Sequence, residues 1–495
     1  MRNTKFILIL IIVTYFVTRF YNLTVIPIFN DESTYIRFGL HQFNEVDHKP
    51  YSLLIGKEPL MPYLYAALGT IINDLLIGAR AISVFFGFLT LLGLFFTVKT
   101  IADNKAGLVV GLIYVFSPYA LFFDRLAVMD NAVNTVAIWT LYFTFKILTN
   151  PQKRFFLILG FAMGIGLWIK TSAIFYVLLP VLVIMHKAYG IWKKDNNSPQ
   201  PTQLILKLSI SLLTMFFLIL PLISNEFYAI HWQLLSQYIY PVYSIFSFPV
   251  TLWIDNLLRV FFWLLFYLSP FFILIIAFTV IRFRKKPKIF PVYLWFFLPF
   301  IYEILFAKMY TSRHALNLTI PLYILAAYFI LKIGKVNKLF AFVMIILIVG
   351  WGTFYGSYLL NYPIGYSKLH LSYAKTDLLQ YTKGFPSGYG VKEAIDYLSE
   401  KMKIKPIVVV IHNDHGNPED AVVAYLSYKK NCEIILIQDG SDISELINGS
   451  KKPVYFVSRG EYNMGLDKYF ANKKTFAKPY DSEYVGVYLL KPERN

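Results

Sequence analysis

The sequence has few charged residues and almost no cysteine. Of its 495 residues, 15% are charged and only one, Cys432, is a cysteine, whereas average soluble proteins carry about 25% charged residues. A single cysteine excludes an intramolecular disulfide and argues against a cysteine-based zinc site. The apolar part of the chain also contains no Gly-rich phosphate loop and no dinucleotide-binding fingerprint, so neither kind of nucleotide site is expected there.

Apolar residues are abundant instead. Hydrophobic residues make up 57% of the chain and aromatic residues 18%. Apolar runs long enough to cross a hydrocarbon core of about 30 Å recur over the first 360 positions. We therefore expect a polytopic α-helical membrane protein with about eleven transmembrane helices. The expected spans are residues 6–26, 80–99, 106–123, 131–148, 155–170, 172–190, 204–224, 256–281, 289–306, 314–332 and 338–358.

The first apolar run and the distribution of charge predict the orientation. The N-terminal run resembles a signal peptide, but no small-residue cleavage site follows it, so we interpret it as a retained helix. The net charge is +18, and the basic residues lie mostly in short loops that share one side of the membrane, such as "RFRKKPK" at 282–288. The positive-inside rule then predicts a cytoplasmic N-terminus and an extracytoplasmic C-terminus in the cell membrane. No nucleic-acid partner is expected, because no soluble basic patch with stacking aromatics is evident.

Composition predicts two domains. Residues 1–359 form the transmembrane domain, with amphipathic, aromatic-rich loops at 30–79 and 225–255 on the outer face. From residue 360 to 495, β-branched runs of strand length such as "PIVVVI" and "YVGVYLL" alternate with helical segments. This pattern predicts a small extracytoplasmic α/β domain. Within it, His412 and His415 in "IHNDHGNPED" are interpreted as part of a strand-to-helix loop and not as metal ligands.

Ionisable residues from distant parts of the chain are expected on the outer side of the membrane. The acids are Asp31, Glu32 and Asp130, and the bases are Lys57, Arg125, Lys170 and Arg313. Taken one at a time, each also fits a structural role, as a helix cap or as a cation at headgroup level. Ionisable residues at membrane depth are costly and tend to mark functional sites. Their joint placement suits a lipid-linked phosphate, gripped by Arg and Lys, with a carboxylate nearby to deprotonate a hydroxyl.

The segments that carry these residues resemble, in order, motifs of the GT-C glycosyltransferases. The resemblance is to the protein O-mannosyltransferase and aminoarabinose-transferase branch. The segments are "NDESTY" (an Asp-Glu motif), "GKEPLMPYLY" (a Lys-Pro-Pro-Leu segment), "DRLAVMDNAV", "GLWIKTSAI" and "SRHALNLTIPLY". Three positions depart from the pattern: Glu58 stands in place of a Pro, His314 in place of a Tyr, and Lys170 precedes Thr171 rather than following it.

The resemblance implies an enzyme that transfers a monosaccharide from a polyprenyl-phosphate donor, with inversion, on the extracytoplasmic face. The acceptor would be a protein, lipid or glycan. On this basis we expect Asp31 to act as general base, Glu32 to orient the acceptor or help hold a cation, and Asp130 to bind acceptor or sugar hydroxyls. The four basic residues would bind and stabilise the donor phosphate. No cofactor is implied; some GT-C branches need a divalent metal, but this sequence offers no convincing ligand set.

Two alternatives from other classes remain open. A transporter or flippase for a lipid-linked or anionic substrate would be expected to show interrupted helices and inverted repeats, which are not evident here. A non-catalytic envelope assembly protein would keep working when Asp31 is replaced by Ala. An enzyme that moves whole oligosaccharides differs from the expected one only in donor size.

Overall fold

The computed structural model describes residues 2–45, 47–195, 197–283, 286–368, 375–461, 465–481 and 483–491. The chain divides into two compact units. Unit 1 consists of Met1–Tyr21, Pro50–Met61 and Ser83–Leu359, and unit 2 of Asn22–Lys49, Pro62–Ile82 and Leu360–Asn495. Composition predicted a boundary at residues 359 and 360, and the chain leaves unit 1 there. Unit 2 additionally contains much of the segment that was predicted to be a long outer loop.

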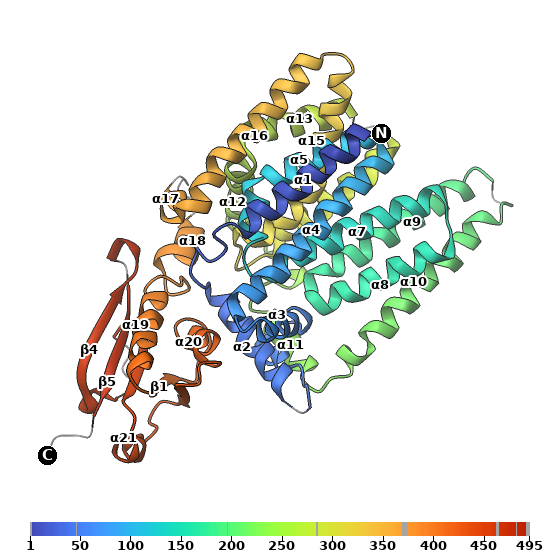
Figure 1. Cartoon of the computed structure of the whole chain (residues 1–495). Coiled ribbons are helices and arrows are strands. Elements are labelled where there is room, and N and C mark those ends of the chain that lie inside the picture. The colour runs from blue at the N-terminus through green and yellow to red at the C-terminus, as the bar shows by residue number, and fades with distance from the viewer. Residues whose placement is uncertain are drawn as a thin grey trace. The chain divides into compact units, whose positions relative to one another are not determined.

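Unit 1 is helical in the part of the chain that the structure describes (Figure 1). Its α-helices are α1 (Arg2–Phe20), α4 (Leu75–Ile101, which starts in unit 2), α5 (Asn104–Phe116), α6 (Pro118–Phe123), α7 (Met129–Thr149), α8 (Lys153–Ile169), α9 (Phe175–Trp192), α10 (Gln200–Ile223), α11 (Tyr228–Leu235), α12 (Val250–Leu268), α13 (Pro270–Phe283), α14 (Phe290–Phe306), α15 (Thr319–Gly334) and α16 (Lys338–Asn361). Short 3₁₀ helices connect them: η1 (Tyr51–Ile55), η2 (Thr171–Ile174), η3 (Val242–Ser247), η4 (Pro287–Ile289) and η5 (Ser312–Leu318).

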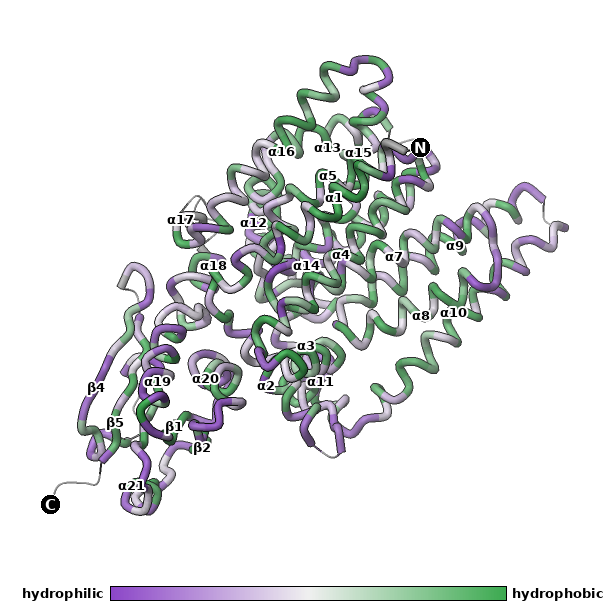
Figure 2. The backbone as a smooth tube through the Cα atoms, viewed as in Figure 1, coloured by the Kyte–Doolittle hydropathy of each residue, from purple (hydrophilic) through white to green (hydrophobic). Residues whose placement is uncertain are grey.

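These helices confirm the predicted multi-span membrane architecture. Among the described residues, eight helices are long and apolar enough to cross a membrane, and three apolar helices are shorter: α3 (Leu60–Ile71), α5 and α13. Figure 2 shows hydrophobic residues along most of these helices and polar ones where α9 and α10 are joined. The eight spans include counterparts of the predicted segments 80–99, 131–148, 172–190, 204–224, 289–306, 314–332 and 338–358.

Two predicted spans are interrupted. The predicted span 256–281 breaks at Ser269, which separates α12 from α13, and the predicted span 106–123 breaks at Ser117, which separates α5 from α6. A proline follows each break and cannot donate the backbone hydrogen bond that would continue the preceding helix. The hydroxyl of Ser117 accepts from Ala120 N, and that of Ser269 from Phe272 N, so each serine begins a new helix. A hydropathy reading passes over such breaks because the residues around them are apolar.

Small residues bring α8 and α10 into close contact. A Cβ added at Gly160 would lie 2.4 Å from the Ser211 carbonyl oxygen, and one at Gly164 would lie 2.9 Å from the Leu218 side chain. The spacing of these glycines is that of a GxxxG packing motif of membrane helices. Trp168 donates its indole N–H to the Leu218 carbonyl at 2.8 Å. This packing fixes the C-terminal end of α8, where Lys170 and Thr171 follow.

Unit 2 contains a five-stranded sheet in the order β2-β1-β3-β5-β4. The strands are β1 (Ile407–His412), β2 (Cys432–Ile437), β3 (Val454–Arg459), β4 (Phe470–Ala477) and β5 (Tyr484–Leu490). β1 pairs in parallel with β2 and β3, whereas β5 is antiparallel to β3 and to β4. The helices and turns are α2 (Asn30–Asn44), α3, α17 (Pro363–Lys368), α18 (Lys375–Leu378), η7 (Leu379–Lys383), α19 (Val391–Ile404), α20 (Glu419–Leu426), α21 (Ser444–Gly449), η8 (Asp467–Tyr469) and η9 (Pro479–Asp481).

The α/β character of the C-terminal segment is confirmed. Val408, Val410, Phe456 and Leu490 lie in a buried cluster with residues that follow β2 and β3. The interval between β1 and α20 is a loop, as predicted for the segment that contains His415. Strand β4 was not predicted, because most of its residues are exposed, four of its eight residues are polar ("FANKKTFA"), and it is defined by pairing with β5.

Helix α2 packs against α20 inside unit 2. Residues Glu32–Leu40 are buried, so the amphipathic stretch expected along the membrane surface is largely covered by protein. Arg37 pairs with Asp420 at 2.7 Å, and Thr34 donates to the same carboxylate at 2.6 Å. Ser33 donates to Asn417 at 2.9 Å. Three polar residues of α2 therefore have partners that the sequence order alone does not suggest.

Candidate functional site

In unit 1, Asp130 and Lys170 form an ion pair. Asp130 lies in the first turn of α7, where a negative charge is favourable, and Lys170 is the residue at which α8 ends. The Lys170 Nζ lies 2.6 Å from Asp130 Oδ1, and the two side chains are 23% and 9% exposed. The structure thus joins two predicted site residues that are distant in sequence.

A second group of polar side chains consists of Glu58, Thr171 and His231, and Thr171 directly follows Lys170 in the sequence. Both the backbone N–H and the hydroxyl of Thr171 donate to Glu58 Oε1. His231 Nε2 lies 3.1 Å from the Thr171 hydroxyl and 3.5 Å from Glu58. Burial lowers the pKa of His231; Glu58 raises it and Lys57 lowers it. Glu58, one of the departures from the family pattern, is therefore a buried hydrogen-bond acceptor that ties three segments together.

Lys57 is a predicted cation that contacts an aromatic side chain. Its Nζ lies 4.4 Å above the ring of Tyr238 and donates to the Tyr238 hydroxyl at 3.3 Å. Within the described part of the chain, no carboxylate lies within ion-pair distance of it. A partly buried ammonium group held by an aromatic ring and a phenol is positioned to bind an anion as a point charge.

Glu303 is a polar residue that the sequence analysis missed. It lies in α14 and accepts hydrogen bonds from Tyr310 at 2.6 Å and from Asn317 at 3.0 Å. Lys170 and Asp130 are charged groups close to it. A carboxylate within the apolar run "FFLPFIYEILF" was the available signal, because acids inside a span are rare and tend to be functional.

These side chains of unit 1 are connected partly by direct contacts and partly by neighbouring positions along the chain. We call Lys57, Glu58, Asp130, Lys170, Thr171, His231 and Glu303 the polar cluster. Arg313 lies on η5, the 3₁₀ helix that also carries Asn317, and is partly buried.

Arg125 has a different environment. It is 2% exposed and donates to the carbonyls of Thr18 and Tyr21 at 3.0 and 2.8 Å, at the C-terminal end of α1. The neighbouring Asp124 pairs with Arg19 at 3.3 Å and accepts from the Tyr114 hydroxyl at 2.9 Å. In this structure Arg125 thus satisfies carbonyls at the end of α1, a role that the charge pattern did not predict.

In unit 2, Asp31 and Glu32 lie in the first turn of α2 but differ in environment. Glu32 is fully buried, and its two oxygens accept from Arg80 Nε and Nη2 at 2.9 and 2.7 Å and from Phe29 N at 2.8 Å. Arg80 also donates to the carbonyls of Leu23 and Ile26. Asp31 is partly exposed and accepts from the Tyr35 hydroxyl at 3.3 Å. Arg80 was missed because the sequence analysis placed it at the start of a span.

No candidate metal centre is found in the described ranges, where no three His, Cys, Asp or Glu side chains are grouped to hold a metal ion.

Comparison with known proteins identifies the fold. Residues 56–223 match the family described as dolichyl-phosphate-mannose-protein mannosyltransferase. The structure of ArnT from Cupriavidus metallidurans bound to undecaprenyl phosphate matches with a TM-score of 0.60 at 12% identity, over 97% of each chain. Apo ArnT from the same organism matches with a TM-score of 0.55 at 13% identity, also over 97% of each chain. No curated protein sequence matches the chain.

The resemblance found in the sequence is therefore confirmed at the level of fold. The chain shares the fold of ArnT, with multiple membrane helices and a small sheet in its C-terminal part. Of the predicted site residues, Lys57, Arg125, Asp130 and Lys170 lie within the segment that the family model matches, whereas Asp31, Glu32 and Arg313 lie outside it.

Proposed function

We propose that the protein is a membrane glycosyltransferase that transfers a monosaccharide from a polyprenyl-phosphate donor to an acceptor on the extracytoplasmic face, with inversion. The observation that carries this proposal is the polar cluster, which gathers cations and carboxylates at helix ends of unit 1. The GT-C fold and the mannosyltransferase family match support the same reaction class. ArnT, whose fold this chain shares, binds undecaprenyl phosphate.

In this proposal the cations of unit 1 bind the donor phosphate. As the bond between the anomeric carbon and the phosphate oxygen breaks, negative charge builds on the polyprenyl phosphate. Lys57 supplies a charge with no carboxylate partner among the described residues, and Lys170 supplies one that Asp130 orients and partly offsets. Arg313 adds a further cation. Preorganised charges of this kind stabilise a transition state without reorganising during the reaction.

Asp31 is the proposed general base. The acceptor oxygen attacks the anomeric carbon from the face opposite the leaving phosphate, and its proton passes to the Asp31 carboxylate. Asp31 is partly exposed, whereas both oxygens of Glu32 are occupied by Arg80 and Phe29. We therefore assign Glu32 a positioning role, in which it fixes the first turn of α2. Asp130 remains a candidate for contact with sugar or acceptor hydroxyls.

The test uses the full-length protein in lipid nanodiscs with a panel of radiolabelled polyprenyl-phosphate sugars and a membrane extract as acceptor source. Asp31→Asn should leave donor binding unchanged and lower transfer by at least about 100-fold, as expected for loss of a general base. Lys57→Met should weaken donor binding by about tenfold. The matched control is Lys308→Met, because Lys308 also lies over a tyrosine ring, at 4.7 Å from Tyr240, but outside the polar cluster.

Wild-type turnover by the Asp31→Asn variant would remove the base assignment. Donor binding without transfer to any acceptor, together with movement of the lipid-linked sugar across the bilayer, would favour a flippase instead.

A further inference from the structure

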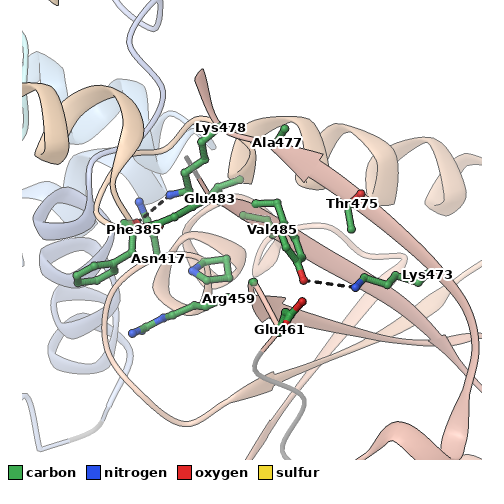
Figure 3. Close-up of a pocket in the computed structure, with 14 residues that line it drawn as sticks. Phe385, Asn417, Arg459, Glu461, Lys473, Thr475, Ala477, Lys478, Glu483 and Val485 are labelled. Atoms are coloured by element: carbon green, nitrogen blue, oxygen red, sulfur yellow. Dashed lines mark hydrogen bonds between the residues drawn. The ribbon is translucent and has the colours of Figure 1, made fainter. Parts of the chain in front are cut away.

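Unit 2 contains a pocket that the proposed roles of Asp31 and the polar cluster do not use. Its volume is about 900 Å³, within the range typical of small-molecule sites. The walls come from the end of β3, from β4 and β5, and from the loop before α20. Figure 3 shows Arg459, Glu461 and Lys473 around it and Lys478 at one end.

Two of its cations are already committed to other groups. Arg459 pairs with Glu419 at 2.8 Å and lies 3.5 Å from Asp414. Lys478 is buried and donates to the carbonyls of Gly384, Phe385 and Ser387 at 2.9, 3.0 and 2.8 Å. An ammonium group has three donors, so Lys478 has none left for a ligand. A pocket built to bind a multiply charged anion would leave these cations available.

The groups that remain are of mixed polarity. Lys473 has no carboxylate partner among the residues that the structure describes, and its Nζ contacts the Tyr484 hydroxyl at 3.4 Å. Glu461 makes no hydrogen bond or ion pair with any described residue. Thr475 adds a hydroxyl and Tyr484 an aromatic ring. Donors, acceptors and an aromatic face together suit a ligand that is rich in hydroxyl groups and has little net charge.

The loop before α20 both lines the pocket and forms hydrogen bonds with the N-terminal turn of α2. Asn417 lines the pocket, and its backbone N–H donates to the Asn30 side chain at 2.8 Å. Its side chain donates to the Ile28 carbonyl at 3.1 Å and accepts from Ser33 at 2.9 Å. Asp31 follows Asn30 directly. The same loop thus borders the pocket and holds the helical turn that carries the proposed base.

We propose that this pocket binds a saccharide, and that a glycan is therefore the acceptor of the transfer reaction. The assignment of the saccharide as acceptor rests on the proposed function, whereas the binding of a saccharide does not.

The experiment measures binding to the full-length protein in nanodiscs, because sugar-based detergents would compete. The probes are three neutral trisaccharides (mannotriose, maltotriose and chitotriose), with inorganic pyrophosphate as the anionic comparison. Saturation-transfer NMR should detect at least one trisaccharide and not pyrophosphate. Lys473→Ala and Glu461→Gln should each weaken trisaccharide binding by about tenfold.

The matched control is Lys474→Ala, the next residue on the same exposed strand. Its ammonium lies 4.4 Å from the Tyr397 ring, and it does not line the pocket. Lys474→Ala should bind as wild type does. The proposal is overturned if no trisaccharide binds, if pyrophosphate binds in their place, or if Lys473→Ala and Lys474→Ala behave alike.

Transfer measured on the same preparations separates the two proposals. Transfer without saccharide binding in the pocket removes this inference and leaves the proposed function standing. Saccharide binding that depends on the pocket, without any transfer, would support the saccharide site and contradict the proposed glycosyltransferase function.

Discussion

At the scale of residues, the adjacent carboxylates of Asp31 and Glu32 differ in burial, and we assign them different roles for that reason. Asp31 is partly exposed in the first turn of α2, and Glu32 is fully buried against Arg80. A motif match cannot separate them, because both belong to the same Asp-Glu pair. Their environments can, since a carboxylate with both oxygens occupied is poorly suited to accept a proton from a substrate.

Glu32→Gln should therefore destabilise the protein more than Asp31→Asn does. The Gln variant leaves the Arg80 guanidinium buried without its counter-charge, which typically costs about 3–5 kcal/mol. Arg80→Lys should also destabilise, because Lys cannot form the two-pronged contact that Arg makes. Thermal unfolding followed by intrinsic fluorescence would check both. Equal melting temperatures for Asp31→Asn and Glu32→Gln would contradict this division.

Glu419 should make stability depend on pH. Burial raises its pKa to about 7, an effect that Arg459 partly offsets. Between the ordinary value of 4.5 and about 7 the folded state holds the proton more tightly than the unfolded state, so stability falls as pH rises through this window. Glu419→Gln removes the titration. Its advantage over wild type should be small at pH 5 and grow to about 2–3 kcal/mol by pH 8.

Melting temperatures measured between pH 5 and pH 8 would test this expectation. The control is the same substitution at an exposed position, Glu400→Gln, where the carboxylate is paired with Lys403. A Glu419→Gln variant whose difference from wild type stays constant would show that the carboxyl group does not titrate in this range.

At the scale of elements, the apolar runs predicted most of the membrane helices and most of the strands. The long runs gave helices because only a helix satisfies its own backbone in a membrane. The elements that were not predicted from the sequence depend on a single residue within an apolar run or on pairing with another segment. The break at Ser269 depends on one proline within an apolar run. Strand β4 depends on pairing with β5, and its own residues, such as Lys473 and Lys474, carry little strand signal.

Ser269→Gly should stabilise the junction of α12 and α13. Ser269 has φ 108° and ψ 151°, a conformation that is nearly restricted to glycine and costs a residue with a Cβ about 1–3 kcal/mol. Loss of the contact from Phe272 N to the Ser269 hydroxyl offsets only a few tenths of a kcal/mol, since Gly is itself an acceptable cap. The melting temperature should rise for Gly and fall for Ser269→Ala, which loses the cap and keeps the strain.

At the scale of the whole molecule, the two units combine segments that are distant in sequence. Composition indicated a separate C-terminal α/β part, but it could not show that residues 22–49 and 62–82 belong with that part. The same is true of the candidate site. Charge placement found Lys57, Asp130 and Lys170, which the fold brings together, but it missed Glu303 and His231, whose roles depend on the packing of distant helices.

Truncation after residue 359 should therefore disorder α2. Arg37, Thr34 and Ser33 would lose their partners Asp420 and Asn417, leaving a buried charge uncompensated. Hydrogen exchange in residues 30–44 should accelerate strongly, whereas exchange in α7 and α8 of unit 1 should change little. Arg37→Ala in the full-length protein should reproduce part of the effect. Unchanged protection of α2 in the truncated protein would show that it folds without the C-terminal segment.

Strand β4 is an edge strand of the sheet, and its lysines affect how copies of the protein associate at high concentration. An edge strand offers unpaired backbone groups to any passing strand, and natural proteins commonly guard such edges with lysine. Among the described residues, β4 pairs only with β5, and it carries Lys473 and Lys474 in its exposed middle. A second molecule that approached this edge in the antiparallel sense would bring like charges face to face. These two lysines, of which Lys473 also lines the pocket, thus oppose aggregation of neighbouring copies in a densely populated membrane.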